Sequence, residues 1–284
     1  MKSKVQSTVH GAISIVNAIA TGYGSALGIS LKVRAEIELQ KGKGIIFRSH
    51  TRDRLITNII SNTVPKDIIQ HNSVTINIES EIPIGVGLKS SSAVSSAIAL
   101  ACISLVKDKI DDRVVLDSAV RASLNAGITL TGAYDDSTAC YFGGFVVTDN
   151  YGCKLISQED APEDLYAIIF LPQSLQRGDV HKLNILSDLF MDAFKLAKAR
   201  EYWKAMKLNG LLATAILSGK YEPILASLQK GALAASISGN GPSIAAVAYR
   251  EHIDAIKGTF ERFDGKTLVS KINNEKASAK VIVG

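Results

Sequence analysis

Alternation of apolar and polar residues marks two stretches in the first third of the chain, residues 31–39 and 74–82. A period of two is typical of a half-buried β-strand, so the pattern predicts two strands. Between them, residues 53–62 repeat their apolar positions one helical turn apart, which predicts a helix. Two later apolar runs, residues 143–149 and 166–171, predict further strands.

The most apolar part of the chain predicts a helix over residues 90–107, which are rich in alanine and serine. Small residues on several faces suit a helix packed inside the protein rather than laid on its surface. The run is too short to cross a bilayer and serines interrupt it, so no membrane role is expected. A second helix is predicted over residues 112–126, with Asp111 or Asp112 as its cap and Gly127 as its stop.

The second half of the chain predicts helices followed by strands. The helices cover residues 185–217, where two of them meet near residue 200, and residues 223–230. The strands cover the start of 235–247, and residues 266–272 and 279–283. Within 235–247 the first strand is followed by a glycine loop, residues 238–242, and then by a segment that fits either a helix or a strand. No low-complexity linker separates the halves. The sequence therefore predicts an α+β protein of two packed domains, residues 1–155 and 156–284.

A glycine- and serine-rich turn, residues 83–93 reading PIGVGLKSSSA, opens directly onto the predicted buried helix. Gly85 and Gly87 allow a tight turn and a close approach of the backbone to an anion. The first N–H groups of a helix lack intrahelical partners and carry the positive end of its dipole. Lys89 adds a full charge and three serines add hydroxyl groups. We call residues 83–93 the phosphate turn, because this pattern predicts that they bind phosphate.

Two other phosphate-binding motifs do not fit this turn. A dinucleotide-binding GxGxxG motif is absent, because Ser90 stands where the third glycine would be. The spacing of a P-loop is not met either. A plain helix connection with a serine cap remains the simple alternative.

The turn resembles the phosphate-binding motif of the GHMP kinases, which include galactokinase, homoserine kinase and mevalonate kinase. The matching positions are Pro83, Gly87, Leu88, Ser90, Ser91, Ser92 and Ala93. Lys89 departs from the usual small residue, and a lysine there is similar to the archaeal shikimate kinases of this family. Through the resemblance, the turn with Gly85 and Lys89 is expected to hold ATP.

Three further segments agree with this branch, namely residues 11–31, 131–144 and 236–248. Together with the turn they span most of the chain in the family's order. The resemblance implies the two-domain GHMP kinase fold, with an N-terminal half like a ribosomal-protein domain and a ferredoxin-like C-terminal α/β sandwich.

Adjacent carboxylates, Asp135 and Asp136, stand in the segment TGAYDDSTACYFGG. Such a pair can bind Mg²⁺ or accept a hydroxyl proton, although neighbouring aspartates also form ordinary turns. By resemblance one of them is the catalytic base; counting from Gly143 favours Asp136 and counting from Gly132 favours Asp135, so the choice stays open. The family's magnesium-binding glutamate has no counterpart in residues 119–127.

The resemblance therefore implies a division of roles. Mg²⁺ is expected on Ser91 and Asp135, and Lys89 is expected to replace the family's N-terminal lysine beside the transferred phosphoryl group. The acceptor is expected to contact a set of residues that lies outside the turn: Ser14, Asn17, Thr21, Asp136, Arg177, Gly239 and Gly241. Of these, Arg177 is the candidate partner for a substrate carboxylate.

The resemblance implies ATP-dependent phosphorylation of the 3-hydroxyl of shikimate, a step toward chorismate and the aromatic amino acids. Homoserine kinase is the nearest rival, and a non-catalytic RNA-binding module is a further alternative. The net charge of +5 is scattered along the chain, which argues against nucleic acid as a partner. Three cysteines without CxxC spacing fit a cytoplasmic protein. The five histidines are expected at the surface, and a homodimer is left open.

Overall fold

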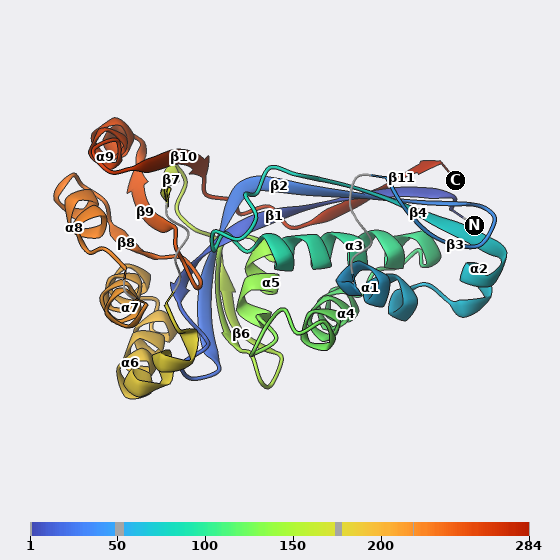
Figure 1. The fold of residues 1–284 in the computed structure, drawn as a ribbon, viewed down its shortest axis with the longest axis horizontal. Helices are drawn as coiled ribbons and strands as arrows, with labels where there is room; N and C mark the ends of the chain where they lie inside the picture. Colours follow the sequence, from blue (N-terminus) through green and yellow to red (C-terminus); the bar gives the residue numbers. More distant parts are fainter. Residues whose placement is uncertain (1, 49–53, 174–177, 218, 284) are drawn as a thin grey trace.

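A computed structural model describes residues 2–48, 54–173, 178–217 and 219–283. Two sheets with helices packed against them form two connected parts, and Figure 1 shows the larger part on the right and the smaller one on the left. The predicted α+β fold is confirmed. The 155/156 division between domains stays a prediction.

The larger sheet is built in the described residues from seven strands. They are β1 (Lys4–Val16), β2 (Tyr23–Lys41), β3 (Gly44–Phe47), β4 (Asn72–Ser80), β5 (Phe145–Asp149), β6 (Lys154–Glu159) and β11 (Ser278–Val283). The order is β11-β1-β2-β4-β3, and β5 joins β2 and carries β6 on its other side. Strand β2 pairs with β4 through its second half and with β5 through its first half. Strand β6 crosses position 155 and β11 returns from the second half, so the sheet draws on both halves of the sequence.

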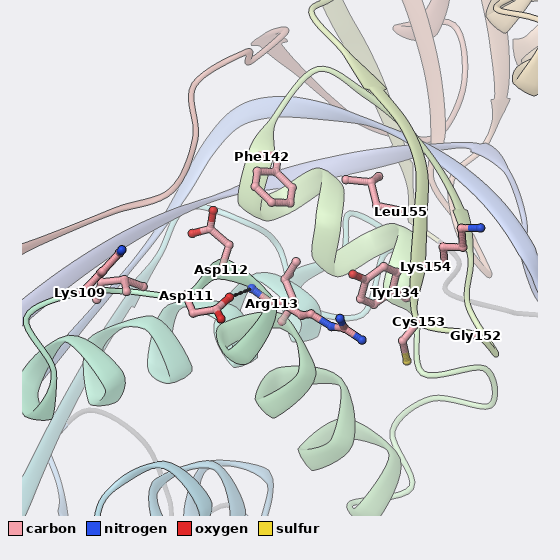
Figure 2. Close-up of a pocket in the computed structure, with 12 residues that line it drawn as sticks. Lys109, Asp111, Asp112, Arg113, Tyr134, Phe142, Gly152, Cys153, Lys154 and Leu155 are labelled. Atoms are coloured by element: carbon pink, nitrogen blue, oxygen red, sulfur yellow. Dashed lines mark hydrogen bonds between the residues drawn. The ribbon is translucent and has the colours of Figure 1, made fainter.

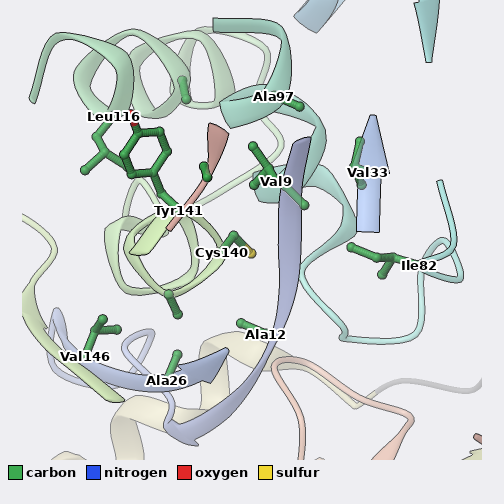
Figure 3. Packing of buried hydrophobic residues seen from close by; sticks show 14 of the residues in the cluster. Val9, Ala12, Ala26, Val33, Ile82, Ala97, Leu116, Cys140, Tyr141 and Val146 are labelled. Carbon is green, nitrogen blue, oxygen red and sulfur yellow. The ribbon is translucent and has the colours of Figure 1, made fainter. Parts of the chain in front are cut away.

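Helices cover one face of this sheet, as Figure 1 shows. They are α1 (Arg54–Thr63), α2 (Lys66–His71), α3 (Ser90–Val106), α4 (Asp112–Asn125) and α5 (Tyr134–Phe142). Most side chains of α3 are buried on all sides, which confirms the predicted internal helix. Figure 3 shows part of this core, with Ala97 of α3, Val9 of β1 and Cys140 of α5 directed into one space. None of the described helices combines the length and the apolarity needed to span a membrane.

The smaller sheet has the order β10-β7-β9-β8. Its elements are β7 (Leu165–Pro172), β8 (Ala234–Ile237), β9 (Ile244–Tyr249), β10 (Gly265–Lys271), α6 (Ser187–Lys198), α7 (Tyr202–Ile216), α8 (Glu222–Gln229), α9 (Ile253–Phe260) and the 3₁₀ turns η1 (Val180–Leu186) and η2 (Arg250–His252). The two parts meet through aromatic rings: Phe145 of β5 stacks on Tyr202 of α7 with ring centroids 4.0 Å apart. One apolar core therefore runs from the larger part into the smaller one.

Differences from the predicted elements have local causes. Strand β1 was not predicted because its second half is buried on both faces and so shows no alternation. Helix α5 was missed because it has only nine residues and starts after Ala133, whose φ is +50°. The segment after the glycine loop is strand β9, one of the two alternatives. Asp53, the predicted start of the first helix, lies outside the described residues.

The expectation that all histidines lie at the surface is wrong for His10, which is 4 % exposed. His10 belongs to β1, between β2 and β11, and pairs with Lys32 on β2. Burial and the charge of Lys32 lower the pKa of His10 below its ordinary value of 6.5.

This lowered pKa predicts a loss of stability in mild acid. Below about pH 6.5 the unfolded chain binds a proton at His10 more readily than the folded chain does, so the free energy of unfolding should decrease as the pH falls. Urea unfolding at pH 7.5 and 5.5 measures the decrease, and His10→Gln should make it smaller. The matched control His71→Gln, at an exposed site, should leave it unchanged; equal pH dependence in all three proteins would contradict the prediction.

Candidate active site

A cavity of about 470 Å³ lies where the two parts of the protein meet. The end of β1, the turn before α3, the start of α5, the loop after β8 and the turn η1 all contribute to its wall. Most of the predicted site residues line it: Ser14, Asn17, Gly85, Gly87, Leu88, Lys89, Ser90, Ser91, Ser92, Asp135, Asp136, Gly239 and Gly241. Segments separated by more than a hundred positions in the sequence are thus brought to one place.

Three predicted site residues do not line this cavity, and a fourth falls outside the described part of the chain. The hydroxyl of Thr21 is used within its own turn, where it accepts a hydrogen bond from Tyr23 N at 3.1 Å. Pro83 is not among the residues that line the cavity, and Ala93 is buried in the first turn of α3. Arg177 lies outside the described residues.

The turn before α3 alternates left-handed residues, with φ values of +78° at Gly85, +91° at Gly87 and +63° at Lys89. Such values cost little for glycine but are strained for lysine. Lys89 precedes the first helical residue of α3, and its side chain makes no hydrogen bond that caps the helix. The helix N-terminus therefore lies beside the cavity with its side-chain cap position open, an arrangement that favours anion binding.

The Lys89 ammonium is held by two partners. It lies 2.8 Å from Asp136 Oδ1 and donates to Ser14 Oγ at 2.7 Å, with only 6 % of the side chain exposed. Burial alone would lower the pKa of Lys89, but the charges of Asp136 and Asp135 outweigh it and raise that pKa. The ammonium therefore stays charged. Because it has three hydrogens, one is left for a ligand in the cavity.

The adjacent aspartates have different surroundings. Asp136 faces Lys89 and its side chain is 17 % exposed, whereas Asp135 is 4 % exposed. Asn150 donates to Asp135 Oδ1 at 2.7 Å and accepts from Asp135 N at 3.0 Å. Burial, together with the charge of Asp136, raises the pKa of Asp135 to about 7. The two carboxylates are thus suited to different roles.

The loop after β8 ties the turn before α3 to β1. Ser238 Oγ donates to Gly87 O at 2.8 Å and accepts from Ser14 N at 3.2 Å. Gly239 N donates to Ser14 Oγ at 2.9 Å, and Asn17 Nδ2 donates to Gly239 O at 3.0 Å. Through these hydrogen bonds the glycine loop holds the phosphate turn against the end of β1.

Among the residues at or beside the cavity that were not predicted are three polar side chains. Asn150 holds Asp135, and Asn209 of α7 accepts a hydrogen bond from Asn17 N at 2.8 Å. His181 of η1 lines the cavity. Asn150 follows a strand and precedes a glycine by two positions, so it reads as part of an ordinary turn, and nothing in the sequence near Asn209 or His181 marks them.

A wider cavity of about 900 Å³ lies at the start of α4, and none of the predicted site residues lines it (Figure 2). Its carboxylates have structural partners. Asp111 accepts a hydrogen bond from Arg113 N at 2.9 Å, and Asp112 pairs with Lys276 at 2.6 Å. The phosphate turn and the free face of the aspartate pair belong to the smaller cavity, which is therefore the candidate active site.

Comparison with known proteins agrees with this geometry. Residues 54–144 match the family described as GHMP kinases N terminal domain, and residues 190–264 match GHMP kinases C terminal. A shikimate kinase of Methanobrevibacter smithii is 34 % identical over 285 residues, which cover 96 % of this chain and 98 % of the relative. A shikimate kinase of Methanosarcina mazei is 35 % identical over 277 residues, 94 % of each chain. The chain belongs to the GHMP kinase family.

Solved structures share the GHMP kinase fold. Homoserine kinase from Cytophaga hutchinsonii has a TM-score of 0.77 at 18 % identity, covering 99 % of this chain and 98 % of that one. L. major mevalonate kinase, solved with R-mevalonate, has a TM-score of 0.73 at 15 % identity, covering 96 % and 98 %. The predicted family and fold are confirmed. As a GHMP kinase, the protein is an ATP-dependent phosphotransferase with an alcohol group as acceptor.

Close packing behind the phosphate turn predicts that Gly87→Ala is harmful. A Cβ at Gly87 would lie 2.0 Å from Ser238 O, so the backbone would have to move. We expect ATP affinity, measured by calorimetry, to fall about 10-fold or more. Gly44→Ala is the matched control, because its φ of +92° is nearly the +91° of Gly87 and nothing lies within 4 Å of the added atom. Equal ATP affinity in both variants would contradict the prediction.

Proposed function

We propose that the protein transfers the γ-phosphoryl group of ATP to the 3-hydroxyl of shikimate, giving 3-phosphoshikimate and ADP. Two observations support shikimate as the acceptor. Relatives named shikimate kinase match nearly the whole chain at 34 to 36 % identity. Lys89, the departure that pointed to this branch, lies in the cavity beside Asp136 and the start of α3. This juxtaposition carries the proposal.

The nucleotide phosphates would lie against the turn before α3. Backbone N–H groups of the turn and of the first turn of α3, with the hydroxyls of Ser90, Ser91 and Ser92, supply donors for phosphate oxygens. The Lys89 ammonium, held by Ser14 and Asp136, would donate its remaining hydrogen to a phosphate oxygen in the same space. Phosphoryl transfer depends mainly on positioning and on neutralising charge, and this wall offers both.

Magnesium fits the donor set of this wall. Mg²⁺ binds with few protein ligands, usually one or two carboxylates beside the phosphates of the substrate. No group of three or more His, Cys, Asp or Glu side chains placed to hold a metal occurs in the part of the chain that is described. Ser91 and Asp135, which line one cavity, would hold the ion. When bound, it would neutralise phosphate charge that develops during transfer.

Asp136 is the proposed base for the acceptor. Its carboxylate is the more exposed of the pair and faces the cavity next to the Lys89 ammonium. Asp136 would orient the acceptor hydroxyl and take its proton, while Lys89 would stabilise the negative charge on the transferred group. Asp135, buried and held by Asn150, is less free to receive a proton from a moving substrate.

The acceptor would lie against the side of the cavity formed by Asn17, Gly239 and Gly241. Ser14 lines the same cavity, and because its oxygen already accepts from Lys89 and from Gly239 N, its own O–H is the group that would donate to the acceptor. Arg177 remains the proposed partner of the carboxylate on sequence grounds alone. A cytoplasmic location and the absence of a nucleic-acid partner also remain predictions.

The acceptor assignment predicts selectivity among carboxylated alcohols. With Mg²⁺ and ATP, a coupled assay of ADP release should give the highest kcat/KM with shikimate. The kcat/KM with homoserine or mevalonate should be at least about 100-fold lower. Product analysis should find the phosphate on the 3-hydroxyl. Faster turnover of homoserine than of shikimate would replace the proposed acceptor with its nearest rival.

The position of Lys89 predicts a loss of turnover without a loss of folding in Lys89→Met. Removing one preorganised donor to a transition-state oxygen costs about 10²- to 10³-fold in kcat, and we expect a decrease of this order. Thermal unfolding checks that the variant is folded. Lys154→Met, at an exposed lysine outside the site, is the control and should keep its full rate. Undiminished turnover of Lys89→Met would remove Lys89 from the mechanism.

A further inference from the structure

The side chain of Asn150 is fully engaged, although it does not touch the candidate active-site cavity. Asn150 follows β5 and is 2 % exposed. Its amide nitrogen donates to Asp135 Oδ1 at 2.7 Å and to Thr131 Oγ1 at 3.2 Å. Its amide oxygen accepts from Asp135 N at 3.0 Å and from Thr148 Oγ1 at 2.8 Å. A primary amide has two donor hydrogens and two acceptor lone pairs, so every hydrogen-bonding position is used.

The contacts allow only one orientation of this amide. The backbone N–H of Asp135 can only donate, so it must meet the amide oxygen, and this leaves the amide nitrogen facing the Asp135 carboxyl group. An aspartate at position 150 would place a second negative charge beside the first. The backbone of Asn150 is itself fixed, since its N–H donates to Gly22 O at 2.8 Å.

The other side of the Asp135 carboxylate is also confined. A Cβ built on Gly24 of β2 would lie 2.5 Å from Asp135 Oδ2, so the carboxylate rests directly against the bare backbone of that strand. Asn150 on one side and Gly24 on the other leave Asp135 little rotational freedom. Asp135 nevertheless lines the cavity, next to Asp136.

We propose that Asn150 is a positioning residue for phosphoryl transfer, a role that rests on the proposed kinase function. By holding Oδ1 of Asp135, Asn150 fixes the direction in which that carboxylate faces the cavity, where it would hold Mg²⁺. The two neighbouring aspartates thereby have different partners. The Asn150 amide holds Asp135, and the Lys89 ammonium holds Asp136. Partners that orient a metal-binding side chain typically contribute about 10- to 100-fold to metal affinity or activity.

A double-mutant cycle distinguishes positioning from simple support of the turn. Asn150→Ala should lower kcat about 10- to 100-fold, with KM for shikimate changed less than about 3-fold. In an Asp135→Asn background the same change should lower kcat less than about 2-fold, because the residue that Asn150 acts on has already lost its charge. Equal losses in both backgrounds would overturn the proposal.

A second variant covers the case in which Asn150→Ala does not fold. Thr148→Val has nearly the same shape and removes one donor to the amide oxygen, at a buried site away from the cavity. It should lower kcat by a smaller factor, about 2- to 10-fold, and again only while Asp135 is intact. A loss of the same size in the Asp135→Asn background would count against the proposal.

Asn274→Ala is the matched control. Asn274 forms a similar two-point contact, donating to Ala161 O at 2.9 Å and accepting from Ala161 N at 2.9 Å, but it holds only backbone outside the site. Its kcat should equal that of the wild type. A loss as large as that of Asn150→Ala would show that removing any such two-point asparagine contact lowers kcat, and would overturn the proposal.

The four proteins of the double-mutant cycle also test this inference independently of the acceptor assignment. They are the wild type, Asn150→Ala, Asp135→Asn and the variant with both changes. If the wild type fails to phosphorylate shikimate, the acceptor is wrong, and the cycle is then read by calorimetry in the affinity for Mg²⁺–ATP, which needs no acceptor. Losses of affinity that are smaller in the Asp135→Asn background support the positioning role. Losses that add overturn it.

Discussion

A buried ammonium between a carboxylate and a hydroxyl is the interaction on which the site depends. Removing a charge from water is costly unless partners replace the lost solvation, and Asp136 and Ser14 do so for Lys89. Ser14 also accepts a hydrogen bond from Gly239, which comes from the smaller part of the protein. The position of the charge is therefore set by both parts together. Lys89 has a strained left-handed backbone, and its side chain points into the protein.

Close backbone contact is the second constraint, and two glycines provide it. Gly87 lies against the carbonyl of Ser238, and Gly24 lies against the carboxylate of Asp135. In both places a side chain would push a functional group out of line. The cavity is thus shaped as much by missing side chains as by the charged ones, and its wall has little room to adjust.

The sequence carried the local features of the site and few of its tertiary relations. The phosphate turn, the buried helix after it and the aspartate pair are contiguous motifs, and all were predicted. The different surroundings of Asp135 and Asp136 were not, because they arise from Asn150 and Lys89, which are distant in sequence. Strand β1 was not predicted, because its second half is buried on both faces and therefore lacks the alternation of apolar and polar residues. Thr21 was placed in the site by its motif, yet its hydroxyl serves its own turn.

The placement of β11 has a consequence for how the protein is made. This strand pairs with β1 in the larger sheet, although it comes after every element of the smaller sheet in the sequence. During synthesis, β1 leaves the ribosome before β11 and keeps one unpaired edge until residues 278–283 follow. Such a distant pairing is slow to form, so the nascent chain carries an open strand edge while the elements between β1 and β11 are made.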